Sequence, residues 1–268
     1  MSALRFAFSN IAWSPHDDPG TLALLRAGGV TGIEIAPTAI WEGWEGSTVA
    51  AAADYRSYLR DQGFEVPALQ ALLFGRPQAQ LFDERGAALL LEHLAHVAAL
   101  GGALGAKVAV FGAPLQRDPG ARSWLQALEQ AVPVLRRAAQ LFLDEGSCLC
   151  IEPNPRAYGC SFVCTTREGV ELVAAVDHPG FGLHLDAAAL FLEQENLASV
   201  LPQALPVLRH FHVSEPGLGN FAAPQAPHGS NLRCLRESGY AHWCSVEMRR
   251  PREPLAAVGP WALIEMAR

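Results

Sequence analysis

The feature of this chain that most constrains its fold is a regular alternation of short apolar runs with longer helical patterns. In the first half the runs are LRFAFS, GIEIAP, EVPALQALL and KVAVFG, followed by helical patterns at 17–29, 48–63, 82–104 and roughly 119–145. In the second half they are SCLCIE, FGLHLD, HFHVS and WCSVEM, followed by helical patterns at 167–177, about 195–208, 229–239 and from 254 onward. Strands that alternate with helices at this spacing predict a parallel sheet with right-handed crossovers.

The number of these units predicts a closed barrel. Eight βα units in 268 residues match the usual size of an α/β (β/α)8 TIM barrel, so we expect a single domain over residues 1–268. Half of the residues are hydrophobic and only 18% are charged, which suits a well-packed core. A doubly wound open sheet is the competing fold, but it usually has a glycine-rich turn after its first strand, and SNIAWSP contains no glycine.

The net charge and the hydropathy of the sequence argue against nucleic acid and membrane as partners. The formal net charge is −7, and the basic residues form no extended stripe, which argues against a nucleic-acid partner. The first residues, MSALRFAFSNIAWSP, lack the apolar stretch of a signal peptide, and we find no segment with the ~18 apolar residues of a membrane span. We therefore expect a cytoplasmic protein with no membrane partner.

The last four apolar runs each have one apolar face and one polar face. In SCLCIE, Leu149 and Ile151 lie on one face and Glu152 lies on the other. The residues at the equivalent position of the next three runs are Asp186, His212 and Glu247. The apolar faces should pack on the helices, so the polar faces should point into the barrel. The four polar residues then lie at the C-terminal mouth, where TIM barrels carry their active sites.

These four side chains together predict a metal site. They are 34, 26 and 35 residues apart, which is one βα unit each, so adjacent strands would bring them side by side. Three carboxylates and one imidazole in a partly dry cavity repel one another unless a cation holds them. An oxygen-rich set with one histidine suits one divalent cation, Mn²⁺, Mg²⁺ or Co²⁺, and Zn²⁺ is a further candidate. The alternative is that the four residues are unrelated and each is solvated at its strand end. Their equivalent positions on four consecutive strands disfavour this alternative.

The motifs IEPNP, HLD, FHVSEP and SVEM, on the last four of eight strands, resemble those of the xylose-isomerase-like barrel superfamily. They are most similar to its sugar phosphate isomerase/epimerase branch. The resemblance implies that Glu152, Asp186, His212 and Glu247 bind one divalent cation and that the two glutamates act as acid and base beside a carbonyl. The chain departs from the better-known epimerases at Ala189, where they carry a second histidine three residues after the aspartate.

The same superfamily includes apurinic-site endonucleases, whose three-zinc centre needs extra histidines on strands three and four. Here those strand ends offer Gln70 and Phe111, and Ala189 removes another expected ligand. One metal ion fits this set of residues and three do not. Together with the acidic net charge, this disfavours an endonuclease.

The chemistry of such a site can be stated without the resemblance. A cation that chelates a carbonyl and a neighbouring hydroxyl acidifies the shared C–H and stabilises an enediolate. One glutamate removes the proton, and the other returns it to the opposite face or to the adjacent carbon. Together with the resemblance, this chemistry implies a metal-dependent sugar isomerase or epimerase, and we hypothesise that Glu152 and Glu247 are its catalytic residues. A dehydratase or lyase with the same first step, and a non-catalytic sugar-binding barrel, are the alternatives.

Six further side chains are candidates for contact with a small carbohydrate: Glu34, Trp13, Gln70, Arg156, Tyr158 and His228. Glu34 points inward from the second run, where a structural hydrogen bond is the alternative role. Trp13 lies in the loop after the first run, where an aromatic side chain can form a wall against a sugar ring. Arg156 and Tyr158 follow IEPNP, and His228 lies in the loop APHGSN. Barrels of this family often dimerise, so a homodimer is compatible with this prediction.

Overall fold

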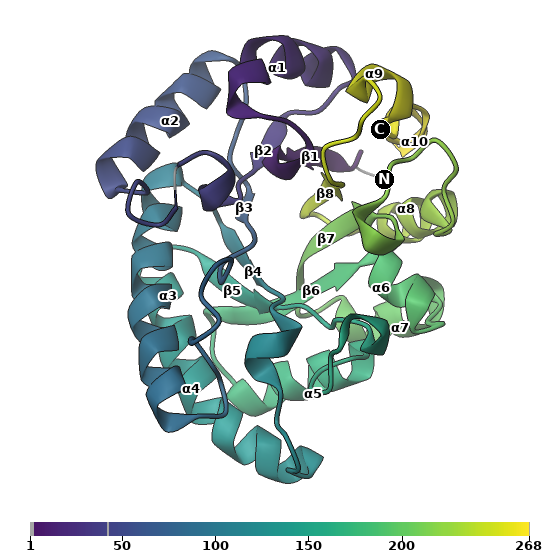
Figure 1. Ribbon diagram of the computed structural model, residues 1–268. Coiled ribbons are helices and arrows are strands. Elements are labelled where there is room, and N and C mark those ends of the chain that lie inside the picture. Colours follow the sequence, from purple (N-terminus) through teal and green to yellow (C-terminus); the bar gives the residue numbers. More distant parts are fainter. Residues whose placement is uncertain (1–2, 42, 268) are drawn as a thin grey trace.

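The computed structural model describes residues 3–41 and 43–267. Eight parallel strands form a barrel that is ringed by helices (Figure 1). The strands are β1 (Arg5–Ser9), β2 (Gly32–Glu34), β3 (Ala68–Leu69), β4 (Val108–Phe111), β5 (Cys148–Ile151), β6 (Phe181–Asp186), β7 (Leu208–Ser214) and β8 (Trp243–Glu247). The predicted TIM-barrel fold is confirmed, with one strand for each apolar run.

The helices follow the predicted pattern with three differences. They are α1 (Asp18–Ala27), α2 (Val49–Asp61), α3 (Glu84–Leu104), α4 (Trp124–Asp144), α5 (Thr166–Val176), α6 (Ala187–Leu192), α7 (Leu197–Ala204), α8 (His228–Glu237), α9 (Leu255–Val258) and α10 (Trp261–Ala267). Helix α4 begins later than predicted because Ser123 and Gln126 form a capping box at its N-terminus. Helix α6 was not predicted, and the last helical pattern is divided into α9 and α10.

The barrel is nearly closed. Hydrogen-bonded neighbours run in the order β2, β1, β8, β7, β6, β5, β4, β3. Between β2 and β3, isolated parallel bridges join Gly32 to Glu65 and Ile35 to Leu69. This seam therefore closes the ring with fewer contacts than the continuous ladders elsewhere.

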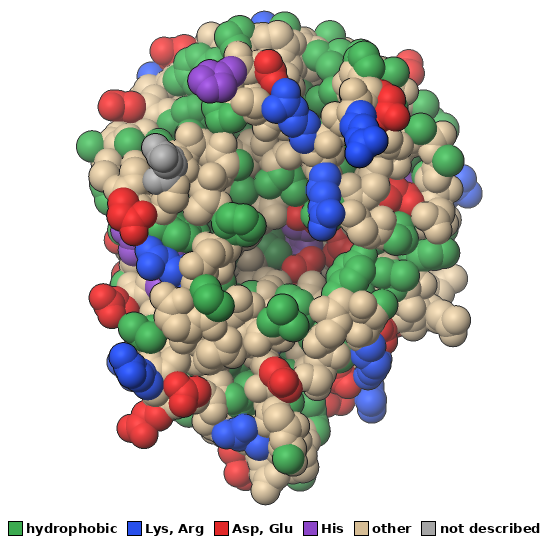
Figure 2. Space-filling view, viewed as in Figure 1, with side chains coloured by type: hydrophobic (Ala, Val, Ile, Leu, Met, Phe, Trp, Pro, Cys, Tyr) green, Lys and Arg blue, Asp and Glu red, His purple; other side chains and the backbone are tan. Residues whose placement is uncertain are grey.

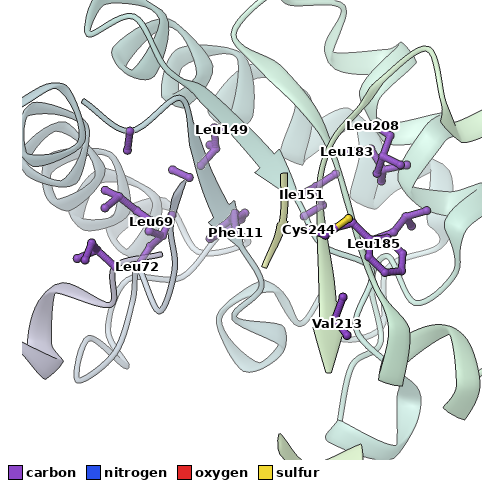
Figure 3. Close-up of a cluster of buried hydrophobic side chains, with 14 of the residues drawn as sticks. Leu69, Leu72, Phe111, Leu149, Ile151, Leu183, Leu185, Leu208, Val213 and Cys244 are labelled. Atoms are coloured by element: carbon purple, nitrogen blue, oxygen red, sulfur yellow. The ribbon is translucent and has the colours of Figure 1, made fainter. Parts of the chain in front are cut away.

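The apolar faces of the strands pack on the helices, as their sequence pattern predicts. Leu149, Ile151, Leu183 and Leu185 are almost completely buried in a large cluster that includes the inner faces of the helices (Figure 3). Cys150, on the opposite face of β5, belongs instead to a small separate cluster with residues of β3 and β4. The alternation of faces leaves the polar residues of β5 to β8 for the barrel interior.

Helix α3 corrects one expectation from the sequence. By length and composition it is apolar enough to cross a membrane. In the structure it packs against α2 and α4, and its buried side chains, including Leu90, Leu94 and Val97, contribute to the main core. Its apolar character is therefore explained by burial inside the helix ring.

Candidate metal centre

A cavity of about 430 Å³ opens at the C-terminal end of the strands. Figure 2 shows a hollow on this face, with acidic and histidine side chains visible within it. The four predicted ligands, Glu152, Asp186, His212 and Glu247, all line this cavity. The expectation that the four strand ends converge is therefore met in the fold.

The strands bring these residues together by their register. Asp186 pairs with His212 across β6 and β7, and His212 and Ser214 pair with Ser245 and Glu247 across β7 and β8. Asp186 also begins α6, because one of its carboxylate oxygens accepts the Ala189 N–H at 2.6 Å. The other oxygen accepts a hydrogen bond from Ser214 Oγ, so the orientation of this carboxylate is fixed.

His212 lies at the centre of the site. Its Nδ1 is 3.2 Å from Glu247 Oε2 and 3.9 Å from Asp186 Oδ2. This nitrogen is buried and has no hydrogen-bond partner within the described chain. A buried polar atom without a partner is rare, and here it faces two carboxylates from the side where a cation would bind. Ligand atoms of Asp186, His212 and Glu247 all lie within 4.8 Å of one another.

Glu34 supports His212 from below. Its Oε1 is 3.0 Å from His212 Nε2, and its Oε2 accepts a hydrogen bond from Ser245 Oγ at 2.7 Å. Burial alone would raise the pKa of Glu34, but His212 and His210 hold it well below the usual value, so this group is a carboxylate. A carboxylate can only accept, so Nε2 carries a proton, and Nδ1 can offer its lone pair to a cation once its own proton is lost.

This position also corrects the expected role of Glu34. The side chain is fully buried and does not line the cavity, so it has no direct access to a molecule bound there. Its contacts fit the structural alternative, in which it orients a histidine. The sequence pattern placed Glu34 correctly inside the barrel but could not give its depth.

The electrostatics of the cavity floor favour a bound cation. Burial, with the nearby charge of Asp186, raises the pKa of Glu152 to about 8. Burial, with the charge of Glu247, raises the pKa of Asp186 to about 6. Burial would lower the pKa of His212, but Glu34 and Glu247 raise it well above the usual value. Neighbouring carboxyl groups with raised pKa values are hard to ionise together. A divalent cation bound between them stabilises their ionised form.

Two other groups of potential ligands share His212. Glu34 and His210 form one of them, and Glu152 and His184 form the other. The group with Glu34 lies below the cavity floor, and its carboxylate is already engaged by Ser245 and His212. His184 Nε2 is 3.7 Å from Glu152 Oε1 and is completely buried. The cavity-facing set of Glu152, Asp186, His212 and Glu247 therefore fits a cation better.

The predicted substrate residues divide into two sets. Gln70 and Tyr158 line the cavity, whereas Trp13, Arg156 and His228 do not. Trp13 Nε1 donates a hydrogen bond to Asp18 at 2.6 Å. Arg156 forms an ion pair with Glu193, which does not line the cavity either.

His228 is held by a carboxylate that the sequence did not single out. His228 Nε2 contacts Glu215 Oε1, and the same carboxylate accepts the N–H groups of Gln225 at 2.8 Å and Ala226 at 3.3 Å. Glu215 lines the cavity and therefore shapes its β7 side. The motif FHVSEP contains Glu215, so its place at a strand end was the signal that could have identified it.

Arg117 is a second residue that the sequence did not reveal. It is completely buried, and its Nη2 donates hydrogen bonds of 2.8 Å to the Glu152 carbonyl and to Asn154 Oδ1. The same nitrogen lies 3.4 Å from Cys160 Sγ. Arg117 thus connects the loop after β4 to the end of β5, where Glu152 is presented. Burial lowers its pKa, although nearby Cys160 and Glu152 oppose that effect.

Gly112 makes room for Glu152. A Cβ atom at this position would collide with Glu152 Oε2. The absence of a side chain directly after β4 therefore lets the Glu152 carboxylate lie where it does.

Arg249 is exposed at the mouth of the cavity. Among the described residues that line the cavity, it is the one lysine or arginine.

A family model and several solved structures match the fold of this chain. A family model described as xylose isomerase-like TIM barrel matches residues 22–263. No curated protein sequence matches the chain significantly. One similar solved structure is 3-keto-D-glucoside 4-epimerase, YcjR, from E. coli, with 17% identity, 99% of each chain covered and a TM-score of 0.78.

Two further solved structures illustrate the range of proteins with this fold. The probable 3-DHS dehydratase AsbF from Bacillus anthracis is 15% identical over 98% of each chain, with a TM-score of 0.73. The IolI protein with a bound zinc atom is 20% identical, with 98% of this chain and 95% of that chain covered and a TM-score of 0.74. At these identities the structural likeness defines the fold, and the family model identifies the lineage. The chain belongs to the xylose isomerase-like TIM-barrel family.

Proposed function

We propose that this protein is an isomerase or epimerase that acts on a sugar or related hydroxy-carbonyl compound and depends on one divalent cation. The observation that carries the proposal is that Asp186 and Glu247 lie beside the unpartnered Nδ1 of His212 in a cavity that Glu152 also lines. Glu152, Asp186, His212 and Glu247 would hold the cation. When bound, the cation would polarise the substrate carbonyl and acidify the adjacent C–H.

The places of the two glutamates support a role in proton transfer. Glu152 directly follows β5 and Glu247 ends β8, so they approach the cavity from different sides of the barrel. Glu152 would remove the proton beside the carbonyl, and Glu247 would return it to the opposite face or to the neighbouring carbon. Asp186 and His212, whose orientations are fixed by Ser214 and Glu34, would mainly hold the cation.

Deuterium wash-in tests the proposal. The protein is loaded with Mn²⁺ and incubated in D₂O with a panel of ketoses, and exchange of the C–H beside the carbonyl is followed by NMR. We expect exchange with the wild type and its loss, by at least about a thousandfold, in Glu152→Gln. Glu171→Gln, at a partly exposed carboxylate of α5, is the control that should keep the wild-type rate. A Glu152→Gln protein with near-wild-type exchange would refute the assignment.

The fold match to a dehydratase supports a second candidate. Dehydration can begin with the same proton removal, so Glu152 would have the same first role. An unsaturated product formed with loss of water would favour a dehydratase or lyase over an isomerase. Binding of both cation and sugar without any exchange would instead favour a non-catalytic sugar-binding barrel.

A further inference from the structure

The two sides of the cavity differ in chemistry. The side formed by β5 to β8 carries the carboxylates, His212 and Arg249. The side formed by the loops after β3 and β4 is mainly apolar: Ala71, Phe74, Ala113 and Pro114 are partly or largely exposed there, whereas Leu72 and Leu73 are almost completely buried. A molecule that fills the cavity therefore meets polar groups on one side and hydrocarbon on the other.

The apolar side extends down to the proposed catalytic group. Gly112 and Ala113 line the cavity, and a Cβ atom at Gly112 would touch the Glu152 carboxylate. Asn154 Oδ1 lies 3.4 Å from such a Cβ atom, so one amide borders the two surfaces at this point. Both surfaces therefore contact the same bound molecule.

The apolar side also extends outward to the rim. Phe74 and Tyr158 line the cavity and are 68% and 42% exposed. Leu115, which is 67% exposed, lies beside the same β5 loop, within contact distance of a Cβ atom at Gly159. Hydrophobic side chains surround the hollow in Figure 2. Large exposed apolar side chains that gather at the mouth of a cavity mark a binding surface.

A substrate with a hydroxyl group on every carbon fits the apolar side poorly. Hydroxyl groups buried against Ala71, Ala113 or Pro114 would lose their hydrogen bonds to water without replacement. Gln70 and Gln116 are the amide side chains on that side, and the Gln70 amide already donates to Ser9 Oγ. This side of the cavity therefore favours a group without hydroxyls.

We propose that the natural substrate carries an apolar substituent, alkyl or aryl, attached to its hydroxy-carbonyl unit. The substituent lies against Ala113 and Pro114 and reaches the rim at Phe74, while the hydroxy-carbonyl unit lies at the floor beside Glu152. The orientation rests on the proposed function, because it assigns the polar end of the molecule to the cation site. The apolar surface is continuous with the cavity, which favours part of the same small molecule over a second copy of the chain as its occupant.

A pair of small probes with the same hydroxy-carbonyl unit tests this inference. Hydroxyacetone and 1-hydroxy-4-phenylbutan-2-one differ in the phenyl-bearing tail alone, and their dissociation constants for the Mn²⁺-loaded protein can be measured by calorimetry. We expect the phenyl compound to bind at least about tenfold more tightly. Phe74→Ser should reduce this ratio severalfold. Met266→Ser, which removes a 65% exposed side chain that does not line the cavity, should leave the ratio unchanged.

The outcomes separate this inference from the proposed function. Equal affinities for the two probes, no binding of either, or a ratio that Phe74→Ser leaves unchanged would overturn the inference, even if sugars undergo deuterium exchange. A tenfold preference that depends on Phe74, together with no exchange for any compound, would refute the proposed function alone. Equal affinities in a dimer that Phe74→Ser dissociates would assign the rim to a second copy of the chain.

Discussion

Glu34 and His212 form the most informative pair at the residue scale. Glu34 accepts from one ring nitrogen and leaves the other free at the cavity floor. We expect Glu34→Gln to weaken Mn²⁺ binding about 10- to 100-fold, because a neutral amide no longer fixes the tautomer and orientation of the ring. Calorimetry with Mn²⁺ measures the change. The exposed Glu65→Gln variant is the control, and an unchanged Mn²⁺ affinity in Glu34→Gln would contradict this role.

Substitution of Gly112 should impair the activity of the protein with little effect on its stability. A methyl group at this position would displace Glu152 Oε2, which is the flexible end of a side chain. We expect Gly112→Ala to reduce Mn²⁺ affinity and C–H exchange at least about tenfold, while the free energy of unfolding changes by less than about 1 kcal/mol. Gly20→Ala, at a position with no atom within 4 Å of the added Cβ, is the matched control. Full exchange activity in Gly112→Ala would show that Glu152 can take another position.

Strand parity was sufficient to predict the four residues of the cavity floor from sequence, but not their supporting contacts. Parity is a local property, and adjacent parallel strands bring equivalent positions together. Arg117 contacts groups 35 and 43 residues away in the sequence, and no local pattern in its own loop indicates that it is buried. Likewise, the partner of Arg156 is Glu193, at the end of α6, which no spacing rule would connect to the loop after β5.

At the scale of the elements, the buried Arg117 side chain connects the loop after β4 to the end of β5. Removing Arg117 leaves the Asn154 side chain and the Glu152 carbonyl without their donor. We expect Arg117→Met to lower the free energy of unfolding by roughly 2 to 4 kcal/mol, as for other buried charged hydrogen bonds. Urea unfolding measures this loss. Arg137→Met, at an exposed position of α4, should change it by less than about 0.5 kcal/mol, and an equal loss in both variants would contradict the prediction.

The elements also explain why the strand positions were predicted whereas helix α6 was not. Most strands are short buried runs between polar segments, so their positions are visible in composition alone, although β3 covers only two residues of EVPALQALL. Helix α6 follows β6 without a loop because Asp186 ends the strand and caps the helix with the same side chain. The run AAALFL after HLD has no polar boundary that would separate it from the strand. Because Asp186 both ends β6 and caps α6, the sequence shows no boundary between the strand and the helix.

For the whole molecule, cation binding should be linked to stability and pH. Below their unfolded-state pKa values, near 4, protonation of Glu152 and Asp186 contributes stability that is lost as pH rises through about 6 and 8. A cation that binds the ionised groups reverses this loss, and its affinity rises with pH. We therefore expect Mn²⁺ to raise the Tm by several degrees at pH 8 and by less at pH 6. Differential scanning calorimetry measures both shifts, and Glu247→Gln should reduce them; a larger shift at pH 6 would contradict the linkage.

The narrow closure between β2 and β3 has a consequence for how activity is lost on heating. Two isolated bridges complete the ring there in place of a continuous ladder, and Glu34, which holds His212, ends the strand on one side of them. A joint without a continuous ladder is expected to separate first. Its separation would loosen the histidine before the helices unfold, so inactivation should begin with release of the cation from a barrel that still has its secondary structure.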